Sequence, residues 1–215
     1  MITVHGAALS PFVRKVLLTL EYKGESFENP PVFPGSDDPE FRKMSPLGKI
    51  PALDHDGFTI SDSSIICRYL DAAFPEKLIY PADAQQQAVA CWIEEFCDSK
   101  LMDVIGTIFQ NRFLKPNLMG QPCDEDAVQE AINNGLPPLL DYLESIMPEQ
   151  GYLVGDSLSI ADLSVATCFA QAQYGGYEVD GAAYPATRKY LDSAFGTSLL
   201  SSRLEVERAA FAPGD

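Results

Sequence analysis

Three short segments within the first 64 residues contain polar side chains and prolines that could together bind a small ligand. The first contains Ser10, which follows an apolar segment and precedes Pro11, a residue suited to the first turn of a helix. A hydroxyl at that place lies beside the unpaired amides of a helix N-terminus. Ser10 either caps the helix or is available to a ligand, and its position alone leaves both interpretations open.

The second segment is the Ile50-Pro51 dipeptide. Only X-Pro bonds adopt the cis form readily, and a cis bond just ahead of a strand often fixes an unusual backbone direction. If this bond is cis, the amide and carbonyl of Ile50 turn outward as a strand-like edge to which a short peptide could pair.

The third segment, Ser61-Asp62-Ser63-Ser64, opens a helix that carries Ile65 and Tyr69 on one face. Hydroxyls and amides at a helix start can hold an incoming carboxylate, and Asp62 suits an ammonium group. The structural alternative is a capping cluster. Taken together, the three segments provide a peptide-pairing edge, a carboxylate site beside an acid, and a hydroxyl at a helix start, a combination that suits glutathione.

Charge and composition exclude several classes of protein. With 215 residues, 46% hydrophobic and 21% charged, the chain can bury a sizeable core. The 31 acidic and 15 basic residues give a net charge of −16, which repels nucleic acid and anionic membranes, so we expect neither as a partner. Because the first 50 residues are nearly neutral, an anionic ligand is best received there.

Cysteine usage and the start of the chain point to a reducing, cytoplasmic location. Five cysteines with no CxxC pair and only two histidines predict buried thiols and no metal site. We expect no signal peptide and no spanning helix, because charged residues interrupt every apolar run.

The positions of apolar residues divide the chain into an α/β part and an all-α part. The expected elements are, in order, a strand near residues 2–4, a helix over 13–20, an extended stretch at 26–33, a short helix near Phe41, strands at 50–54 and 58–60 around an Asp56-Gly57 turn, and a helix over 65–73. This order is βαβαββα. We therefore predict an α/β domain at 1–76, a linker at 77–84 and an all-helical domain at 85–215.

Within the helical part, residues 84–115 predict one long helix or two stacked ones. Pro137-Pro138 inside a helical pattern predicts a kink or restart, since proline is costly in a helix interior. Ser159 and Asp162 have the spacing of a capping box, a structural feature with no chemistry of its own.

The chain also resembles a known family. The segments that carry the resemblance are Ser10-Pro11-Phe12, 45–53 (SPLGKIPAL), 60–70 (ISDSSIICRYL) and 159–162 (SIAD). They occur in the order seen in cytosolic glutathione transferases, across the same break from α/β to all-α. The resemblance implies a thioredoxin-like N-terminal domain, a helical C-terminal domain, a homodimer, and glutathione as co-substrate without a metal.

The resemblance also implies roles for individual residues. Ser10 matches the serine that hydrogen-bonds the glutathione sulfur; Ile50 and Pro51 match the pair that holds the cysteinyl part; Asp62 and Ser63 match the acid–serine pair at the γ-glutamyl head; and Lys49 is a contact for the glycyl carboxylate. The family more often has Glu or Gln where Asp62 stands. No tyrosine precedes Tyr22 and no cysteine stands at position 10, which favours a serine-type enzyme.

The function implied is conjugation of the glutathione thiolate to small hydrophobic electrophiles, a detoxification activity. Two alternatives stay open: a non-catalytic interaction or stress-response scaffold, and a glutathione-dependent reductase or isomerase. By analogy with the family, the electrophile pocket lies between the loop at 7–9, the helix at 108–113 and the tail near Phe211.

Overall fold

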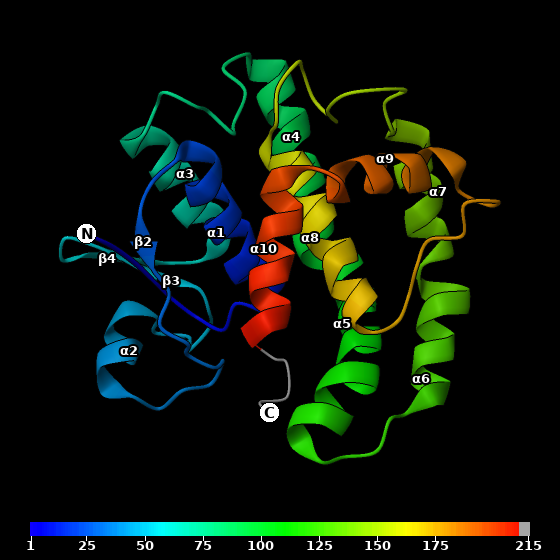
Figure 1. Ribbon diagram of the computed structural model, residues 1–215, viewed down its shortest axis with the longest axis horizontal. Helices are drawn as coiled ribbons and strands as arrows, with labels where there is room; N and C mark the ends of the chain where they lie inside the picture. Colours follow the sequence, from blue (N-terminus) through cyan, green and yellow to red (C-terminus); the bar gives the residue numbers. More distant parts are fainter. Residues whose placement is uncertain (211–215) are drawn as a thin grey trace. The chain divides into compact units, whose positions relative to one another are not determined.

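The computed structural model describes residues 1–210, which form two compact units (Figure 1). Residues 1–80 and the last helix make up the N-terminal unit, and residues 81–196 make up the helical unit. In the first, the elements are β1 (Ile2–His5), α1 (Pro11–Lys23), β2 (Phe27–Glu28), α2 (Pro39–Met44), β3 (Ala52–His55), β4 (Phe58–Ser61), α3 (Ser63–Ala73) and α10 (Ser198–Ala210). The predicted order βαβαββα is confirmed.

The sheet of the N-terminal unit has the strand order β2-β1-β3-β4, with β1 and β2 parallel and the other pairs antiparallel. Figure 1 shows α1 and α3 on one side of this sheet and α2 on the other. The core between the sheet and helices α1 and α3 consists of side chains at helical or alternating spacing: Val4, Val16, Leu17, Leu20, Leu53, Ile66 and Leu70.

The hairpin between β3 and β4 turns at Asp56 and Gly57, as predicted. Their φ angles are 52° and 89°, and two left-handed residues in a row are what a tight hairpin turn requires. The Gly57 amide also donates to the Asp54 carboxylate at 2.8 Å. The hairpin fixes the register of β4 against β3.

The final helix, α10, packs in the N-terminal unit rather than with residues 81–196. The Arg14 guanidinium of α1 donates hydrogen bonds of 2.7 to 2.9 Å to both carboxylate oxygens of Glu207, and both side chains are fully buried. Seven residues along α1, Glu21 faces Arg203 at 3.4 Å, and burial raises the pKa of that carboxyl. The compact units therefore differ from the predicted division at 76 and 85 in this element.

The helical unit begins with an unbroken helical run over residues 84–119, as expected. Its elements are α4 (Ala84–Phe96), the π turn η1 (Cys97–Leu101), α5 (Met102–Phe109), η2 (Gln110–Met119), α6 (Glu125–Glu130), η3 (Ala131–Gly135), α7 (Pro137–Ile146), α8 (Ile160–Tyr174) and α9 (Pro185–Phe195). The predicted restart is confirmed, because α7 begins at Pro137 directly after η3.

The capping box at the start of α8 is also confirmed. One oxygen of the buried Asp162 carboxylate accepts from the amide and hydroxyl of Ser159 at 2.8 and 2.7 Å. The other accepts from the Leu153 amide and the Tyr190 hydroxyl. Asp162 therefore joins α8, the preceding loop and α9.

Candidate functional site

The three segments singled out in the sequence meet at one end of the sheet. Strand pairing places His5 opposite Ala52, and Ala52 opposite Ser61. The loop to Ser10 leaves β1 after His5, Ile50-Pro51 enters β3 before Ala52, and Asp62-Ser63 follows Ser61. The register of β1, β3 and β4 therefore brings the three segments together at the same end of the sheet, which is called the sheet edge below.

Helices α1 and α3 run parallel, so both begin at this edge. Three side-chain contacts at matching intervals show the alignment: Lys15 Nζ to Ser64 Oγ at 3.2 Å, Thr19 Oγ1 to Cys67 Sγ at 3.4 Å, and Lys23 Nζ to Asp71 at 2.7 Å. Two helix N-termini with their partial positive charges thus share one end of the sheet, which favours an anionic ligand.

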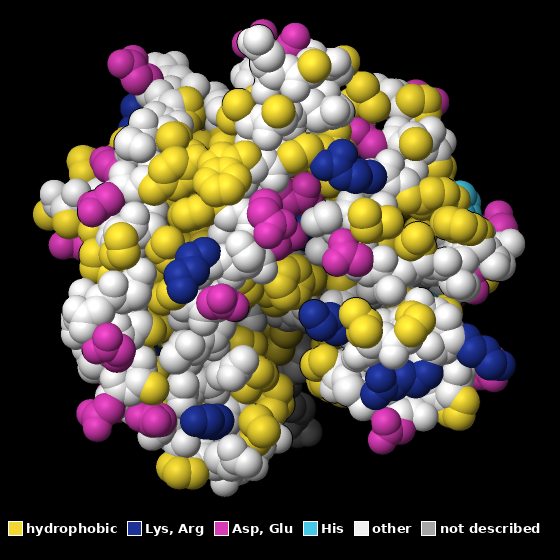
Figure 2. Space-filling model, turned by 180° about the vertical axis from the view of Figure 1, so that it is seen from behind, with side chains coloured by type: hydrophobic (Ala, Val, Ile, Leu, Met, Phe, Trp, Pro, Cys, Tyr) yellow, Lys and Arg dark blue, Asp and Glu magenta, His cyan; other side chains and the backbone are white. Residues whose placement is uncertain are grey.

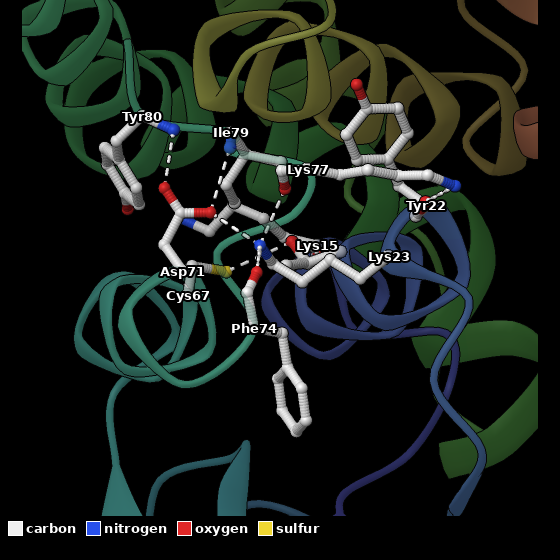
Figure 3. Close-up of polar contacts among 10 residues, drawn as sticks. Lys15, Tyr22, Lys23, Cys67, Asp71, Phe74, Lys77, Ile79 and Tyr80 are labelled. Atoms are coloured by element: carbon white, nitrogen blue, oxygen red, sulfur yellow. Dashed lines mark hydrogen bonds and ion pairs between the residues drawn. The ribbon is translucent and has the colours of Figure 1, made fainter. Parts of the chain in front are cut away.

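A buried ionic network joins α1 and α3 near their C-terminal ends (Figure 3). Asp71 accepts hydrogen bonds from Lys23 and from the amides of Ile79 and Tyr80, all between 2.7 and 2.9 Å. Lys23 donates in addition to the carbonyls of Phe74 and Lys77. These contacts fix the C-terminal ends of α1 and α3, and so hold their N-terminal ends in register at the site.

Ser10 occupies the N-cap position of α1 but its side chain makes no capping hydrogen bond. Its hydroxyl has no hydrogen-bond partner among residues 1–210, and the residue is partly exposed. The backbone around it is held firmly: the Ser10 amide donates to the Ala7 carbonyl at 2.9 Å, and Arg14 donates to the Leu9 carbonyl at 3.4 Å. The capping interpretation of Ser10 is therefore not supported.

The Ile50-Pro51 bond is cis, as the sequence suggested it could be. Neither the amide nor the carbonyl of Ile50 has a hydrogen-bond partner within the described part of the chain. Lys49 is exposed, and its ammonium likewise has no partner among these residues. The Ser45 hydroxyl donates to the Lys49 carbonyl at 2.7 Å, which holds the backbone just before Ile50.

Gly48 belongs to the same turn and cannot be replaced by another residue without strain. Its φ is +65°, and a Cβ there would come within 2.5 Å of the Arg42 guanidinium, which donates to the Ser36 carbonyl. Figure 2 shows Lys and Arg side chains gathered near α2 at the lower right. Arg42 and Lys43 of α2, together with Lys49, are three of the six basic residues in the nearly neutral first 50 residues.

Asp62 combines a capping role with an unusual backbone conformation. One carboxylate oxygen accepts from the amides of Ser64 and Ile65 at 3.1 and 3.2 Å, so the capping interpretation is confirmed for this side chain. Its φ of 82° lies in the left-handed region, which is rare for residues other than glycine and concentrates at functional sites. The buried Ser63 follows, and its hydroxyl has no hydrogen-bond partner in residues 1–210.

Sequence reasoning missed Asn29, Ser45 and Lys15, which hold the backbone or the helix starts at this edge. The Pro30-Pro31 pair was the one available signal for Asn29, because two prolines remove backbone donors from an extended segment. Lys15 gave a misleading signal, since its charge predicts exposure although the side chain is fully buried.

The predicted electrophile pocket cannot be assembled from one unit. The loop at 7–9 belongs to the N-terminal unit and the helix at 108–113 to the helical unit. In the latter, Phe109 stacks on Phe113 at 5.2 Å and Tyr174 packs edge-on against Phe113 at 5.4 Å. Phe211 lies outside the described residues.

Two further observations concern metals and membranes. In residues 1–210, no three His, Cys, Asp or Glu side chains are grouped as a metal site requires. None of the helices in that range combines the length and hydropathy needed to cross a bilayer.

Comparison with family models matches both parts of the chain. Residues 4–78 match the model described as "Glutathione S-transferase, N-terminal domain", and residues 115–195 match "Glutathione S-transferase, C-terminal domain". The first match ends two residues beyond the predicted domain limit at 76, and the second lies within the range predicted for the helical domain.

Individual relatives agree with the family models. The chain is 29% identical to glutathione S-transferase 4 of Zea mays over 180 residues, covering 80% of this chain and 79% of that protein. It is 30% identical to maleylacetoacetate isomerase of Rattus norvegicus over 176 residues, covering 80% and 77%. A solved structure of glutathione S-transferase-I bound with the ligand lactoylglutathione superposes with a TM-score of 0.84 at 21% identity, covering 95% and 99% of the two chains.

Proposed function

Because the chain belongs to the glutathione S-transferase superfamily, we propose that it binds glutathione at the sheet edge of its N-terminal unit and transfers the thiolate to small hydrophobic electrophiles. The observation that carries this proposal is the Ser10 hydroxyl, which lies at the start of α1 without a capping bond. A serine whose hydroxyl is not used by the helix can donate to an anion bound there.

A hydrogen bond from Ser10 is strong enough to lower the pKa of the glutathione thiol by the amount that the reaction needs. An alkyl thiol titrates near 8.5, and lowering its pKa by about two units takes roughly 2.7 kcal/mol. A hydrogen bond to a charged group supplies about 1.5 to 3 kcal/mol, and a helix N-terminus about 0.3 to 1. The thiol proton leaves to solvent, and the thiolate then forms the new C–S bond as the electrophilic carbon releases its leaving group, such as a halide ion, with the bonding electrons, without a covalent enzyme intermediate.

The backbone of Ile50 is the proposed partner of the cysteinyl residue. Its unpaired amide and carbonyl lie one residue before β3, so an extended peptide can pair with them as it would with a strand edge. Pro51 in the cis form directs this backbone, and the Ser45 contact holds it from the other side.

The two ends of glutathione are assigned to charged groups at the same edge. The Ser63 amide and hydroxyl hold the γ-glutamyl carboxylate at the start of α3, while the second oxygen of Asp62 receives the ammonium. Lys49 reaches the glycyl carboxylate as an exposed cation. One oxygen of Asp62 already accepts from the amides of Ser64 and Ile65, so the proposed site uses that oxygen for the helix cap and the other for the ammonium.

We further propose that the protein is a homodimer and acts in detoxification in the cytoplasm. All five cysteines are free thiols, which agrees with a reducing compartment. Light scattering at micromolar concentration should give about twice the 23.5 kDa monomer mass. A mass near that of the monomer contradicts the dimer without affecting the proposed chemistry.

A second candidate is a glutathione-dependent isomerase, favoured by the 30% identity to maleylacetoacetate isomerase. Both reactions begin with the same thiolate, but an isomerase returns glutathione unchanged. Assaying glutathione consumption separates them: conjugation consumes one thiol for each product formed. A disulfide reductase is disfavoured by serine at position 10, and Ser10→Cys should move activity toward thiol exchange.

The experiment that tests the proposal is retention on immobilised glutathione followed by turnover with a generic electrophile such as an activated haloarene. Retention with turnover supports the transferase. Retention without turnover supports the scaffold alternative, and failure to bind glutathione overturns the assignment of the site.

A further inference from the structure

Asn29 is the first residue after β2, and its side chain reaches across to the neighbouring strand. Its Nδ2 donates to the carbonyl of Val4 at 2.7 Å and to the carbonyl of Gly6 at 3.0 Å. An amide nitrogen has two hydrogens, and both are used on backbone oxygens of the segment that leads out of β1.

The sequence next to Asn29 explains why a side chain is needed there. Residues 30–32 continue beside residues 6 and 7, because Gly6 donates to the Pro30 carbonyl at 3.2 Å and Ala7 to the Val32 carbonyl at 2.8 Å. Pro30 and Pro31 have no N–H group, so they cannot donate in the opposite direction. The Asn29 side chain supplies the donors that these prolines lack.

The segment from Val4 to Ala7, which these hydrogen bonds hold and which is called the clamped segment below, leads directly to Ser10. A Cβ on Gly6 would lie 2.5 Å from a Val13 methyl and 3.3 Å from Ile50 Cβ, so the backbone at Gly6 fits closely between α1 and the Ile50 turn. The next residue, Ala7, accepts the hydrogen bond of the Ser10 amide at 2.9 Å. Two backbone steps thus connect the Asn29 clamp to the residue that bears the hydroxyl.

We propose that Asn29 is a positioning residue for catalysis: its double hydrogen bond holds the segment from Val4 to Ala7 so that the Ser10 hydroxyl points at the glutathione sulfur. The inference rests on the proposed function, since it takes Ser10 as the residue that donates a hydrogen bond to the glutathione thiolate. It adds a residue that touches neither glutathione nor the electrophile. Small displacements of a reacting group are costly, with about 1 Å reaching 100-fold in rate.

The test is Asn29→Asp, which keeps the shape of the side chain but replaces the two donors with an oxygen facing two carbonyls. We expect the pKa of the enzyme-bound glutathione thiol, measured by the ultraviolet absorbance of the thiolate, to rise by about one unit, which corresponds to roughly a tenfold loss in thiolate at a pH below both pKa values, where the rates are compared. We expect kcat to fall about tenfold and the glutathione Kd to change less than about threefold. Asn29→Ala, which removes the donors without adding charge, should shift the thiol pKa in the same direction.

Two matched controls separate positioning from stability. Asn117→Asp makes the same chemical change at an exposed asparagine that donates to the Phe113 carbonyl. Thr19→Val removes a buried hydroxyl that donates to the Lys15 carbonyl, and so lowers stability within the same unit without touching the clamped segment. Both should leave the thiol pKa unchanged.

A double-mutant cycle with Ser10→Ala decides whether Asn29 acts through Ser10. If it does, Asn29→Asp has no further effect on the thiol pKa once Ser10 is alanine. Additive shifts, or an Asn29→Asp and Asn29→Ala pair that melt earlier but keep the wild-type thiol pKa, overturn the inference while leaving the proposed function intact. A thiol pKa that Ser10→Ala itself does not raise overturns the role of Ser10, and the inference with it.

Discussion

The starts of α1 and α8 both carry a serine at the N-cap position, yet the two serines are used differently. At α8, the Ser159 hydroxyl donates to the Asp162 carboxylate at 2.7 Å and the residue is buried. At α1, the Ser10 hydroxyl makes no such bond and the residue is partly exposed. The third helical position explains the difference, because α8 has Asp162 there and α1 has Val13.

The comparison shows that a helix start becomes available to a ligand when its own sequence leaves it unfinished. A carboxylate three residues after the cap satisfies the serine and the first amides from within the chain. Where a valine stands instead, the hydroxyl and the helix charge remain available for an anion from outside. By the same criterion α3 is intermediate, since Asp62 satisfies two amides and Ser63 satisfies none.

The largest expected effect is on the structural side of this comparison. Asp162→Ala removes four hydrogen bonds from a buried carboxylate and should lower the free energy of unfolding by about 3 kcal/mol or more. Thermal unfolding should shift down by roughly 10 °C. Turnover per folded molecule should stay at the wild-type value, and a selective loss of kcat would contradict the separation of the two helix starts.

Ser10→Ala is the complementary change. Losing a hydrogen bond to the thiolate should lower kcat about 10- to 150-fold and raise the apparent pKa of its pH profile. The free energy of unfolding should change by less than about 0.5 kcal/mol, because no cap is lost. Ser159→Ala is the matched control, with a loss of about 1 kcal/mol in stability and no change in rate. If Ser10→Ala keeps its rate and pH profile, another donor, such as a backbone amide near Phe12, holds the sulfur.

Ser63→Ala tests the intermediate case at α3. The hydroxyl has no partner in the described structure, so its loss should be felt in ligand binding alone. We expect the free energy of glutathione binding, measured by calorimetry, to become less favourable by about 1 to 3 kcal/mol. Ser99→Ala, at an exposed serine that donates to the Glu95 carbonyl, is the control. An unchanged Kd for Ser63→Ala shows that the γ-glutamyl group is bound elsewhere.

The smallest expected effect is on the pH dependence of stability around Asp162. Burial and the neighbouring Asp162 raise the pKa of Tyr190 above its usual value, so its contribution to stability is full below about pH 10 and is lost as pH rises through the folded-state pKa. Tyr190→Phe should cost about 1 kcal/mol at neutral pH and reduce the alkaline loss of stability in denaturant titrations. Tyr177, whose pKa burial raises to about 12, lacks the bond to Asp162, so Tyr177→Phe should reduce the alkaline loss without the neutral-pH cost.

Features governed by local sequence were predictable. The alternation of apolar residues predicted the element order, Asp56-Gly57 predicted the hairpin, and Pro137 predicted the restart at α7. The extended stretch expected at 26–33 is a strand only at Phe27–Glu28, because the prolines that follow cannot donate to a ladder. The six residues assigned to glutathione binding stay predictions.

Features that depend on partners distant in sequence were not predictable. Arg14 and Glu207 are 193 residues apart, and neither residue type indicates a buried helix contact on its own. Asn29 likewise reads as a turn residue, and its role appears only once residues 4–7 lie beside it. The π-helical segments η1, η2 and η3 of residues 1–210 continue the helices around them, so the apolar pattern of the sequence does not distinguish them from α-helix.

The pairing of Arg14 with Glu207 also sets an order of events during synthesis. The first 80 residues leave the ribosome well before α10, because residues 81–196 are translated in between. At about 5 to 20 residues per second that interval is roughly 6 to 23 s. Throughout it, Arg14 of the nascent N-terminal unit lacks Glu207, the carboxylate that it bonds in the finished fold, so the unit cannot complete its fold before α10 has been made.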